Sequence, residues 1–418
     1  VKLLNDVQIN TYLNLGYLPR LDCTPFPAAW LGEACAPDVC PHESAADLVG
    51  ECVHLFRDAI CRSAERFNVV PISGGLDSRA VLAILKEEGY EIHAITIGTP
   101  GTLDYELPTL VTKSLGVTHE KIDIGRLKYD TDSMVKAARR IGDYTSVLAT
   151  SFHLLAADLY PDQVIQTGLL GDFIGGSSCQ ARTAEVSWEE SKTRYIKKPA
   201  RTALLAPEFD VMSIFSGLER LHPNLSHMEE LAYRARHTCT FRPHLFNDCL
   251  PYRRPLRDET LIRFMFSRCR ERRSGSRLYH SCLRYINSDI FELPSTTSLG
   301  GLSRRSNGLF RMCNLGKKWV HDLLPRTLPK PVYPFNNYFD VNVMLLRNRS
   351  FLELMEENMS DLEKRECVPW LSPEKIVLDA KAGKYSSIKS AGSHPLTSLL
   401  DLELLLKANV IPPKDLLT

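Results

Sequence analysis

Four short apolar segments, each preceded or followed by a helical pattern, constrain the fold of this chain more than any other feature. They cover Phe67–Ile72, Glu91–Ile97, Thr118–Ile124 and Val164–Thr167. The connecting sequences have the apolar spacing of amphipathic helices, at 79–88, 104–114, 130–141 and 147–159. Strands joined by connections of helix length run parallel. We therefore expect an α/β fold, with a parallel sheet that carries helices on both faces.

The rest of the chain has a different character. Residues 1–50 are interrupted by prolines and are interpreted as an irregular wrapping segment. Beyond about residue 185 the strand signal fades, and helical patterns occur at 208–220, 226–237, 258–271, 278–286, 313–324, 340–358 and 398–408. We predict three parts: the irregular segment 1–50, a sheet domain at 51–185, and a mostly helical region at 186–418.

Composition places the chain among ordinary globular proteins. Of its 418 residues, 44% are hydrophobic and 24% are charged, and a net charge of +1 disfavours a surface built to bind nucleic acid. No apolar run approaches the ~18 residues of a membrane-spanning helix, and the start shows no signal-sequence pattern. The twelve cysteines include no C-x-x-C pair, so we expect reduced, mostly buried thiols in a cytoplasmic protein.

One loop carries the strongest chemical signal. Ser73-Gly74-Gly75-Leu76-Asp77-Ser78 joins a buried strand to a helix. Its glycines let the backbone approach an anion, and the N–H groups at a helix start favour negative charge. Asp77 would repel phosphate unless it holds Mg²⁺, which bridges to phosphate oxygens. The absence of a Walker A lysine fits chemistry at an α-phosphate, and a plain strand-to-helix turn is the alternative interpretation.

Further motifs surround this loop in a definite order. Tyr12-Leu-Asn-Leu-Gly-Tyr-Leu-Pro19 precedes it, and Gly98-Thr-Pro-Gly-Thr-Leu-Asp104, Leu115-Gly-Val-Thr-His119 and Thr167-Gly-Leu-Leu-Gly-Asp-Phe-Ile-Gly-Gly176 follow. With these motifs the chain resembles the PP-loop ATP pyrophosphatases, and among them the synthetase half of asparagine synthetase. The resemblance covers roughly residues 5–180 and continues weakly to about residue 340.

The resemblance implies an ATP-dependent, amide-forming ligase. In that family a carboxylate attacks the α-phosphate of ATP, pyrophosphate leaves, and ammonia or an amine takes the acyl group from the adenylate. ATP and Mg²⁺ are the implied cofactors, with one Mg²⁺ on Asp77 and another on Asp172. The resemblance also implies that adenine lies at Ile97 and Gly98, and that the phosphates lie at the 73–78 loop and at Gly168.

Acidic positions depart from the family pattern. Phe173 stands where the family has a glutamate of the intermediate-forming site, which argues against aspartate as the substrate. Residues 141–144 are Ile-Gly-Asp-Tyr, where asparagine synthetase has Ile-Glu-Thr-Tyr. We therefore take Asp143, as a partial replacement for the missing acid, and the retained Tyr144 as catalytic candidates.

Among the basic positions, one matches the family pattern and one departs from it. The family has a late lysine, before an aromatic residue, that stabilises charge during amide formation. Lys330 is the candidate for this role, with Lys317 and Lys318 as rivals, and a solvated surface lysine is the alternative interpretation. Arg79 replaces a small residue of the family, and we expect it to contact a phosphate or a carboxylate.

The resemblance does not extend to the family's glutaminase half, which begins with a cysteine nucleophile. The first cysteine here is Cys23, and the stretch before Ser73 is too short for that domain. We therefore expect a small-molecule carboxylate to be joined to free ammonia, to an amine, or to the product of a separate glutaminase or biosynthetic partner protein.

Two other functions remain open. A PP-loop tRNA-modifying enzyme, of the thiolase or lysidine synthetase type, is favoured by nine arginines between 253 and 277, although paired catalytic cysteines are missing. We prefer to interpret these arginines as a solvated helical face with internal ion pairs. A homologue that binds nucleotide without turnover is suggested by Phe173.

Overall fold

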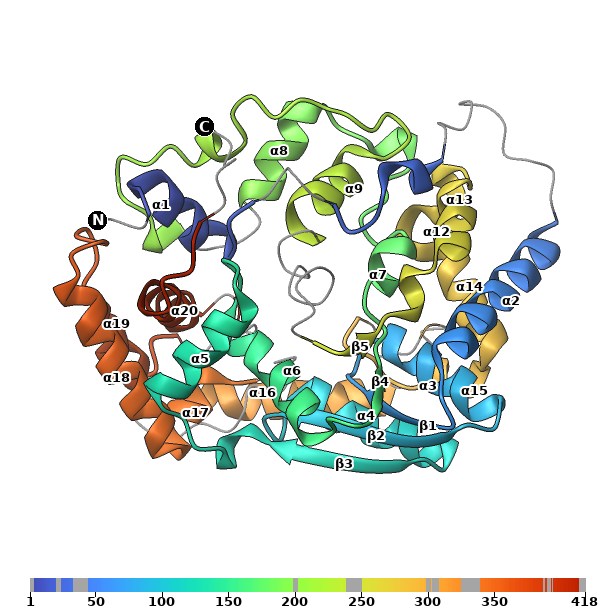
Figure 1. The fold of residues 1–418 in the computed structure, drawn as a ribbon, viewed down its shortest axis with the longest axis horizontal. Coiled ribbons are helices and arrows are strands. Elements are labelled where there is room, and N and C mark those ends of the chain that lie inside the picture. Colours follow the sequence, from blue (N-terminus) through green and yellow to red (C-terminus); the bar gives the residue numbers. More distant parts are fainter. Residues whose placement is uncertain are drawn as a thin grey trace.

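A five-stranded parallel sheet forms the lower part of the computed structural model (Figure 1). Its strands are β1 (Phe67–Pro71), β2 (Glu91–Gly98), β3 (Thr118–Asp123), β4 (Val164–Gln166) and β5 (Tyr252–Arg253), in the spatial order β3-β2-β1-β4-β5. The structure describes residues 4–19, 24–32, 44–197, 202–237, 250–297, 302, 308–324, 339–385, 388, 392 and 394–412. The sheet confirms the α/β fold that the sequence predicts.

The strand order places two loops beside a crevice. β1 pairs with β2 on one side, where Val70 lies beside Ala94, and with β4 on the other, where Val69 lies beside Ile165. After β1 the chain moves outward through β2 and β3, then returns to the opposite side of β1 as β4. In open parallel sheets, ligands bind outside the carboxyl ends of the strands at such a reversal.

Five helices accompany the first four strands. They are α2 (Ala45–Ser63), α3 (Asp77–Glu87), α4 (Leu103–Leu115), α5 (Thr131–Ile141) and α6 (Val147–Leu159). The sequence predicts all of them, because each has a sustained helical period. Capping explains the ends of α5: Asp130 Oδ1 accepts the N–H of Ser133 at 2.8 Å, and Gly142 ends the helix with a φ of 65°.

The two faces of the sheet pack into different cores. Val69 and Ile95 belong to a cluster that includes α5, α6 and the C-terminal helices. Val70 and Ala94 belong to a second cluster with α2 and α3. Neighbouring residues of a strand point to opposite faces, so a strand buried on both sides is apolar throughout.

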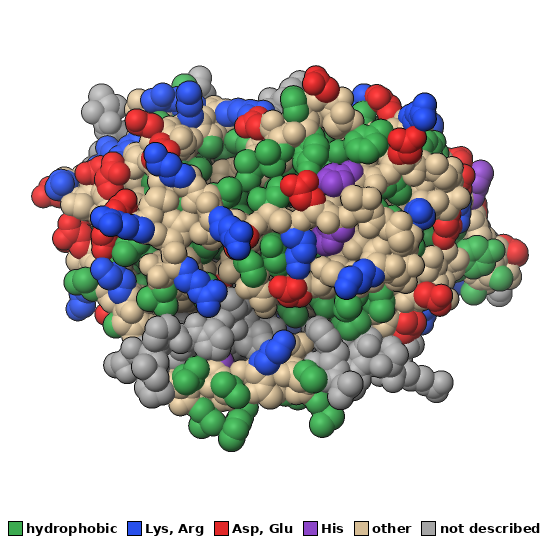
Figure 2. All heavy atoms as spheres, turned by 90° about the horizontal axis from the view of Figure 1, so that it is seen from below, with side chains coloured by type: hydrophobic (Ala, Val, Ile, Leu, Met, Phe, Trp, Pro, Cys, Tyr) green, Lys and Arg blue, Asp and Glu red, His purple; other side chains and the backbone are tan. Residues whose placement is uncertain are grey.

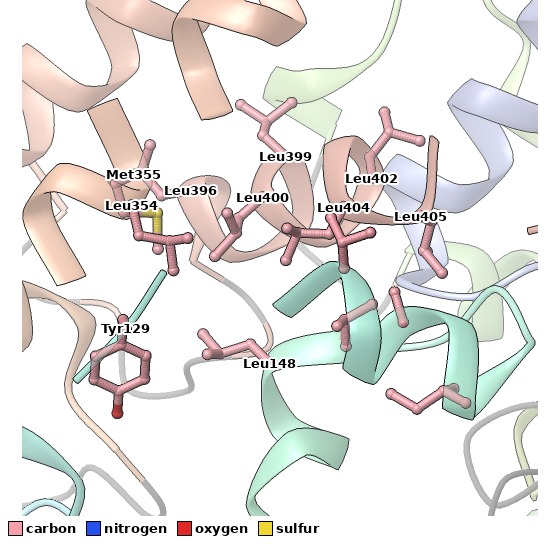
Figure 3. Packing of buried hydrophobic residues seen from close by; sticks show 14 of the residues in the cluster. Tyr129, Leu148, Leu354, Met355, Leu396, Leu399, Leu400, Leu402, Leu404 and Leu405 are labelled. Carbon is pink, nitrogen blue, oxygen red and sulfur yellow. The ribbon is translucent and has the colours of Figure 1, made fainter. Parts of the chain in front are cut away.

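The helix α20 (Pro395–Lys407) lies inside the first core (Figure 3). Its buried leucines are Leu396, Leu399, Leu400, Leu402, Leu404, Leu405 and Leu406. The same helix caps α6, because Asp401 accepts the N–H of Leu148 at 2.8 Å and the hydroxyl of Ser146 at 2.7 Å. A segment near the end of the chain therefore positions a helix of the sheet domain.

Helices dominate the chain beyond residue 185, as expected. They are α8 (Trp188–Lys197), α9 (His227–Leu231), α12 (Glu259–Phe266), α13 (Arg270–Arg273), α14 (Arg277–Ile286), α15 (Ser288–Glu292), α16 (Gly308–Leu323), α17 (Val341–Arg347), α18 (Arg349–Lys364) and α19 (Pro373–Lys381). Two boundaries were predicted wrongly. The 208–220 segment contains only a 3₁₀ turn at Val211–Phe215, and the 340–358 segment divides at Asn348, whose side chain caps α18.

The N-terminal segment is not wholly irregular, which corrects the prediction for residues 1–50. It contains α1 (Asp6–Leu15), which starts with a capping box in which Asn5 accepts the N–H of Gln8 at 2.8 Å. Tyr12 and Leu13 of this helix are fully buried in the first core. The segment therefore contributes to the interior as well as wrapping it.

Two further expectations concern membranes and cysteines. Within the described ranges, every helix is too short or too polar to cross a membrane. Among the cysteines that the structure describes, six are free thiols, as expected: Cys52, Cys61, Cys179, Cys282, Cys313 and Cys367. Cys269 is disulfide-bonded, so the expectation of reduced thiols is wrong at that position.

We predict that Leu400→Ala lowers the free energy of unfolding by about 2–5 kcal/mol, because it leaves a cavity in the first core. Leu378→Ala, on the exposed face of α19 where the leucine is 63% exposed, is the matched control and should change stability little. Urea unfolding of both variants measures the difference. Equal losses would contradict the central position of α20.

Candidate nucleotide-binding site

A cavity of about 310 Å³ opens at the carboxyl ends of β1, β2 and β4. Six of the residues predicted for the site lie on its wall: Ser73, Gly75, Asp77, Ser78, Ile97 and Gly168. The remaining wall is formed by Pro71, Ile72, Ile95, Asp104, Phe152, His153, Ala156, Thr167, Leu169 and Tyr252. The loops after β1 and β4 therefore meet at one cavity, as the reversal in strand order predicts.

The 73–78 loop, which we call the PP-loop, folds into an anion cradle at the start of α3. The Ser73 N–H donates to Ser78 Oγ at 3.3 Å, and the Gly75 N–H donates to Ser73 Oγ at 3.2 Å. α3 begins at Asp77, so the free N–H groups of its first turn lie beside the cavity. Such a helix start favours a bound anion.

Three residues predicted for nucleotide binding lie outside the cavity wall. The N–H of Gly74 donates to Asp104 Oδ1 at 2.7 Å. Leu76 is buried in the second core, and Gly98 is buried at the end of β2, where it pairs with Asp123 of β3. These residues shape the loop and the strand end instead of lining the space.

Asp77 and Asp172 lie close together beside this cradle. The hydroxyl of Tyr279, from α14, donates to Asp77 Oδ1 at 2.6 Å, and the backbone N–H of Asp172 also donates to Asp77. Burial, together with the negative charge of Asp172, raises the pKa of Asp77 to about 7. Two carboxylates that repel each other in this way fit a hard cation, since Mg²⁺ binds through one or two carboxylates together with phosphate oxygens and water.

Two glycines permit this approach. A Cβ atom on Gly168 would lie 2.6 Å from the carbonyl carbon of Asp77, and one on Gly171 would lie 2.5 Å from Asp77 Cγ. Either side chain would force the two segments apart. The sequence implies that Gly168 is small to admit phosphate, whereas the structure shows that it is small to admit the start of α3.

Phe173 is a core residue. It lies on the short helix α7 (Gly171–Ile174), is fully buried, and stacks on Tyr233 with ring centres 5.9 Å apart. His237 and Phe266 contact its other sides, with ring centres at 4.6 and 5.6 Å. The side chain that replaces the family's glutamate therefore packs inside an aromatic cluster.

The catalytic candidates near residue 144 are not brought to the cavity. Tyr144 is 1% exposed, its hydroxyl donates to the carbonyl of Val410 at 2.9 Å, and burial raises its pKa. Asp143 is also buried and accepts the N–H of Tyr144 at 2.9 Å. Lys330 lies outside the described residues, and its rivals Lys317 and Lys318 are on α16. The geometry gives Tyr144 a structural task.

Sequence reasoning missed the wall opposite the PP-loop. Phe152 and His153 come from α6, and Tyr252 comes from β5. The hydroxyl of Tyr252 donates to the carbonyl of His153 at 2.7 Å. Burial lowers the pKa of His153 to about 4, so its ring is neutral near pH 7. α6 is apolar along most of its length and β5 has only two residues, so neither carried a recognisable signal.

The arginines between 253 and 277 are largely engaged within the protein. Arg273 forms a buried ion pair with Glu229, and Arg270 pairs with Glu185 at 2.6 Å. Arg257 donates to the carbonyl of Pro25 at 3.0 Å. On the face seen in Figure 2, the described basic and acidic side chains are interspersed. The internal ion pairs agree with the interpretation preferred from the sequence, but Arg270 and Arg273 are buried, so the expectation of a solvated face is wrong for these two.

We predict that Gly168→Ala weakens binding of Mg²⁺-pyrophosphate roughly ten-fold or more, because the added carbon displaces the start of α3. Gly50→Ala in α2, where an added Cβ meets no atom within 4 Å, is the control and should leave binding unchanged. Titration calorimetry on both variants provides the measurement. Wild-type affinity in Gly168→Ala would contradict the close packing described above.

We predict that Phe173→Glu does not restore the family's acid but destabilises the protein by about 3 kcal/mol or more, since a carboxylate cannot be solvated inside an aromatic cluster. Phe173→Leu, which keeps an apolar side chain, should lose less. Thermal and urea unfolding compare the two. A Phe173→Glu protein as stable as the wild type would show that the position has access to solvent.

Comparisons with known proteins agree with this geometry. The model of a family described as asparagine synthase matches residues 55–267, which is half of the chain. Two 7-cyano-7-deazaguanine synthases from Rickettsia bellii, strains OSU 85-389 and RML369-C, are 43% identical over 56 residues. That match spans 13% of this chain and only a quarter of each relative's length. On the family match, its motifs and its fold, the chain belongs to the asparagine synthase family.

Proposed function

We propose that this chain is an ATP-dependent amide-forming ligase that activates a carboxylate as an acyl-adenylate. The family it belongs to uses ATP, and the adenylating chemistry is our proposal. The observation that carries it is the Asp77–Asp172 pair at the N-terminus of α3, in which Asp77 lies on the cavity wall and Asp172 acts on Asp77 from behind that wall. An anion cradle next to two carboxylates suits a polyphosphate that arrives with divalent cations.

Different residues serve different steps of the proposed adenylyl transfer. In this proposal the PP-loop and the first turn of α3 bind the departing pyrophosphate through backbone N–H groups and the hydroxyls of Ser73 and Ser78. Mg²⁺, when bound by Asp77 and Asp172, neutralises charge on the phosphates. Tyr279 orients Asp77 through its 2.6 Å hydrogen bond. A loop without lysine leaves the α-phosphate as the reacting centre, since a Walker A lysine reaches the β- and γ-phosphates.

The apolar part of the cavity suits a planar base. Ile95, Ile97 and Ala156 lie on its wall together with Phe152. We place the adenine here, because most nucleotide pockets are lined by apolar side chains with a few polar groups that fix orientation. This wall also excludes water from the reacting phosphate, which protects an acyl-adenylate from hydrolysis.

The acid substrate differs from aspartate in this proposal. Phe173 occupies the place of the family's glutamate and is sealed in the core, so the site lacks that carboxylate. The second substrate is ammonia or an amine, supplied freely, by a separate glutaminase, or by a biosynthetic partner in the cytoplasm. Lys330 keeps its proposed role in stabilising charge during amide formation, and Asp143 stays a candidate acid.

We also propose that the helical region 186–418 completes the site of the 51–185 domain. Residues 1–50 are a separate segment in this division, which resembles the family's linker between domains. Tyr279, which donates a hydrogen bond to Asp77, and Tyr252, which lines the cavity, both come from the helical region. The tRNA-modifying alternative is disfavoured, because the arginines that suggested it are engaged in internal contacts.

The test is product analysis with ATP, Mg²⁺ and a panel of carboxylic acids. We expect AMP and pyrophosphate, and we expect Asp77→Asn and Asp172→Asn to reduce the rate by roughly a hundred-fold or more, because charge on the leaving group is then uncompensated. Asp158→Asn on the surface of α6 is the control. Release of ADP and phosphate would overturn the mechanism, and tight ATP binding without adenylation of any acid would favour a non-catalytic homologue.

A further inference from the structure

A buried guanidinium lies directly beneath the PP-loop. Arg79, on α3, is 0% exposed. Its NH1 donates to the carbonyls of Ile290 and Leu293 at 3.1 and 3.3 Å, and its NH2 donates to the carbonyls of Gly74, at 3.1 Å, and Pro294. Arg79 thus points away from the cavity wall, which corrects the expectation that it contacts substrate directly.

Among the residues that the structure describes, the positive charge of Arg79 has no carboxylate within ion-pair distance. Its described hydrogen-bond partners are neutral backbone carbonyls, and Asp104 is the carboxylate whose charge acts on it. An arginine guanidinium stays protonated inside proteins, so this group carries its charge at neutral pH. A charge surrounded by neutral dipoles keeps its field, which a close ion pair would cancel.

Gly74 connects this charge to the cavity. Its carbonyl accepts from Arg79 and from the Thr296 N–H at 3.0 Å, while its N–H donates to Asp104 Oδ1 at 2.7 Å. An added Cβ would lie 2.7 Å from Thr296 Cγ2, so Gly74 is held on both sides. Ser73 and Gly75, its neighbours in the chain, line the cavity.

We infer that Arg79 and Asp104 are positioning residues of opposite electrostatic effect on the phosphate site. Arg79 gives the PP-loop, from below, the positive potential that a loop lysine gives in other nucleotide-binding loops, and Asp104, at the cavity wall, reduces it. This inference rests on the proposed function, because it concerns the affinity of the same site for a polyphosphate. Both residues also hold Gly74 in place, so a purely structural role would make both variants bind pyrophosphate more weakly. Only the electrostatic effect changes the affinity for pyrophosphate in opposite directions in the two variants.

The experiment compares a polyphosphate with a neutral ligand. Binding of Mg²⁺-pyrophosphate and of adenosine is measured by calorimetry at pH 8 on the full chain, for wild type, Arg79→Met, Arg79→Lys and Asp104→Asn. Burial raises the pKa of Asp104 to about 6, so the carboxylate is ionised at this pH. The asparagine keeps an oxygen for the Gly74 N–H and removes the charge, while an NH₂ group takes the place of the second oxygen.

We expect Arg79→Met to weaken pyrophosphate binding about ten-fold and Asp104→Asn to strengthen it several-fold, with adenosine changed less than about two-fold in both. Arg79→Lys should bind pyrophosphate more tightly than Arg79→Met even where the lysine variant is equally or less stable to heat, because affinity then follows the charge and not the stability. Arg273→Met, which removes another buried arginine that is not on the cavity wall, is the control and should leave both ligands unaffected.

The outcomes separate the two proposals. Failure of the wild-type chain to bind pyrophosphate would overturn the proposed function. Normal wild-type binding with weaker pyrophosphate binding in Asp104→Asn, or with equal losses for pyrophosphate and adenosine in Arg79→Met, would overturn this inference and leave the residues a purely structural task. If Arg79→Met does not fold, Arg79→Lys and Asp104→Asn decide the question.

Discussion

The close packing of Gly168 and Gly171 against the start of α3 is the constraint on which the site depends. It presses two chain segments together at the reversal in strand order, and it brings Asp172 beside Asp77. Burial, together with the negative charge of Asp172, raises the pKa of Asp77, so holding both carboxylates ionised at this position costs free energy. The hydrogen bond from Tyr279 and the helix start offset part of this repulsion.

The sheet domain does not form this arrangement alone. Tyr279 reaches Asp77 from α14, and the carbonyls that surround Arg79 come from α15 and the residues after it. The core clusters also cross the predicted boundary at residue 185, since α20 packs on α5 and α6 while α12 and α14 pack on α2. The helical region therefore supplies contacts to Asp77 and to Arg79.

The spacing of apolar residues predicted the fold well in the part of the chain where each strand and helix has a clear period of its own. The strands and helices between residues 67 and 166 have clear periods and caps, so their order defines a parallel sheet. The pattern failed where tertiary contacts decide. β5 exists as two residues paired with β4, and the helix predicted at 340–358 divides because Asn348 caps the second half. In α1 a capping box was present in the sequence, but the prolines that follow it obscured the signal.

The sequence by itself determined the succession of strands and helices along the chain and the parallel sheet, because these follow from local periodicity and from the length of the connections. The resemblance to the family added Asp77 and Asp172 as candidate ligands of Mg²⁺. Only the tertiary structure decided which way each side chain points. It placed Tyr144 and Phe173 in the core, turned Gly74 and Arg79 away from the cavity, and brought Phe152 and Tyr252 to its wall. The physical reason is that burial and hydrogen-bond partners depend on contacts between residues far apart in the chain, which no local pattern records.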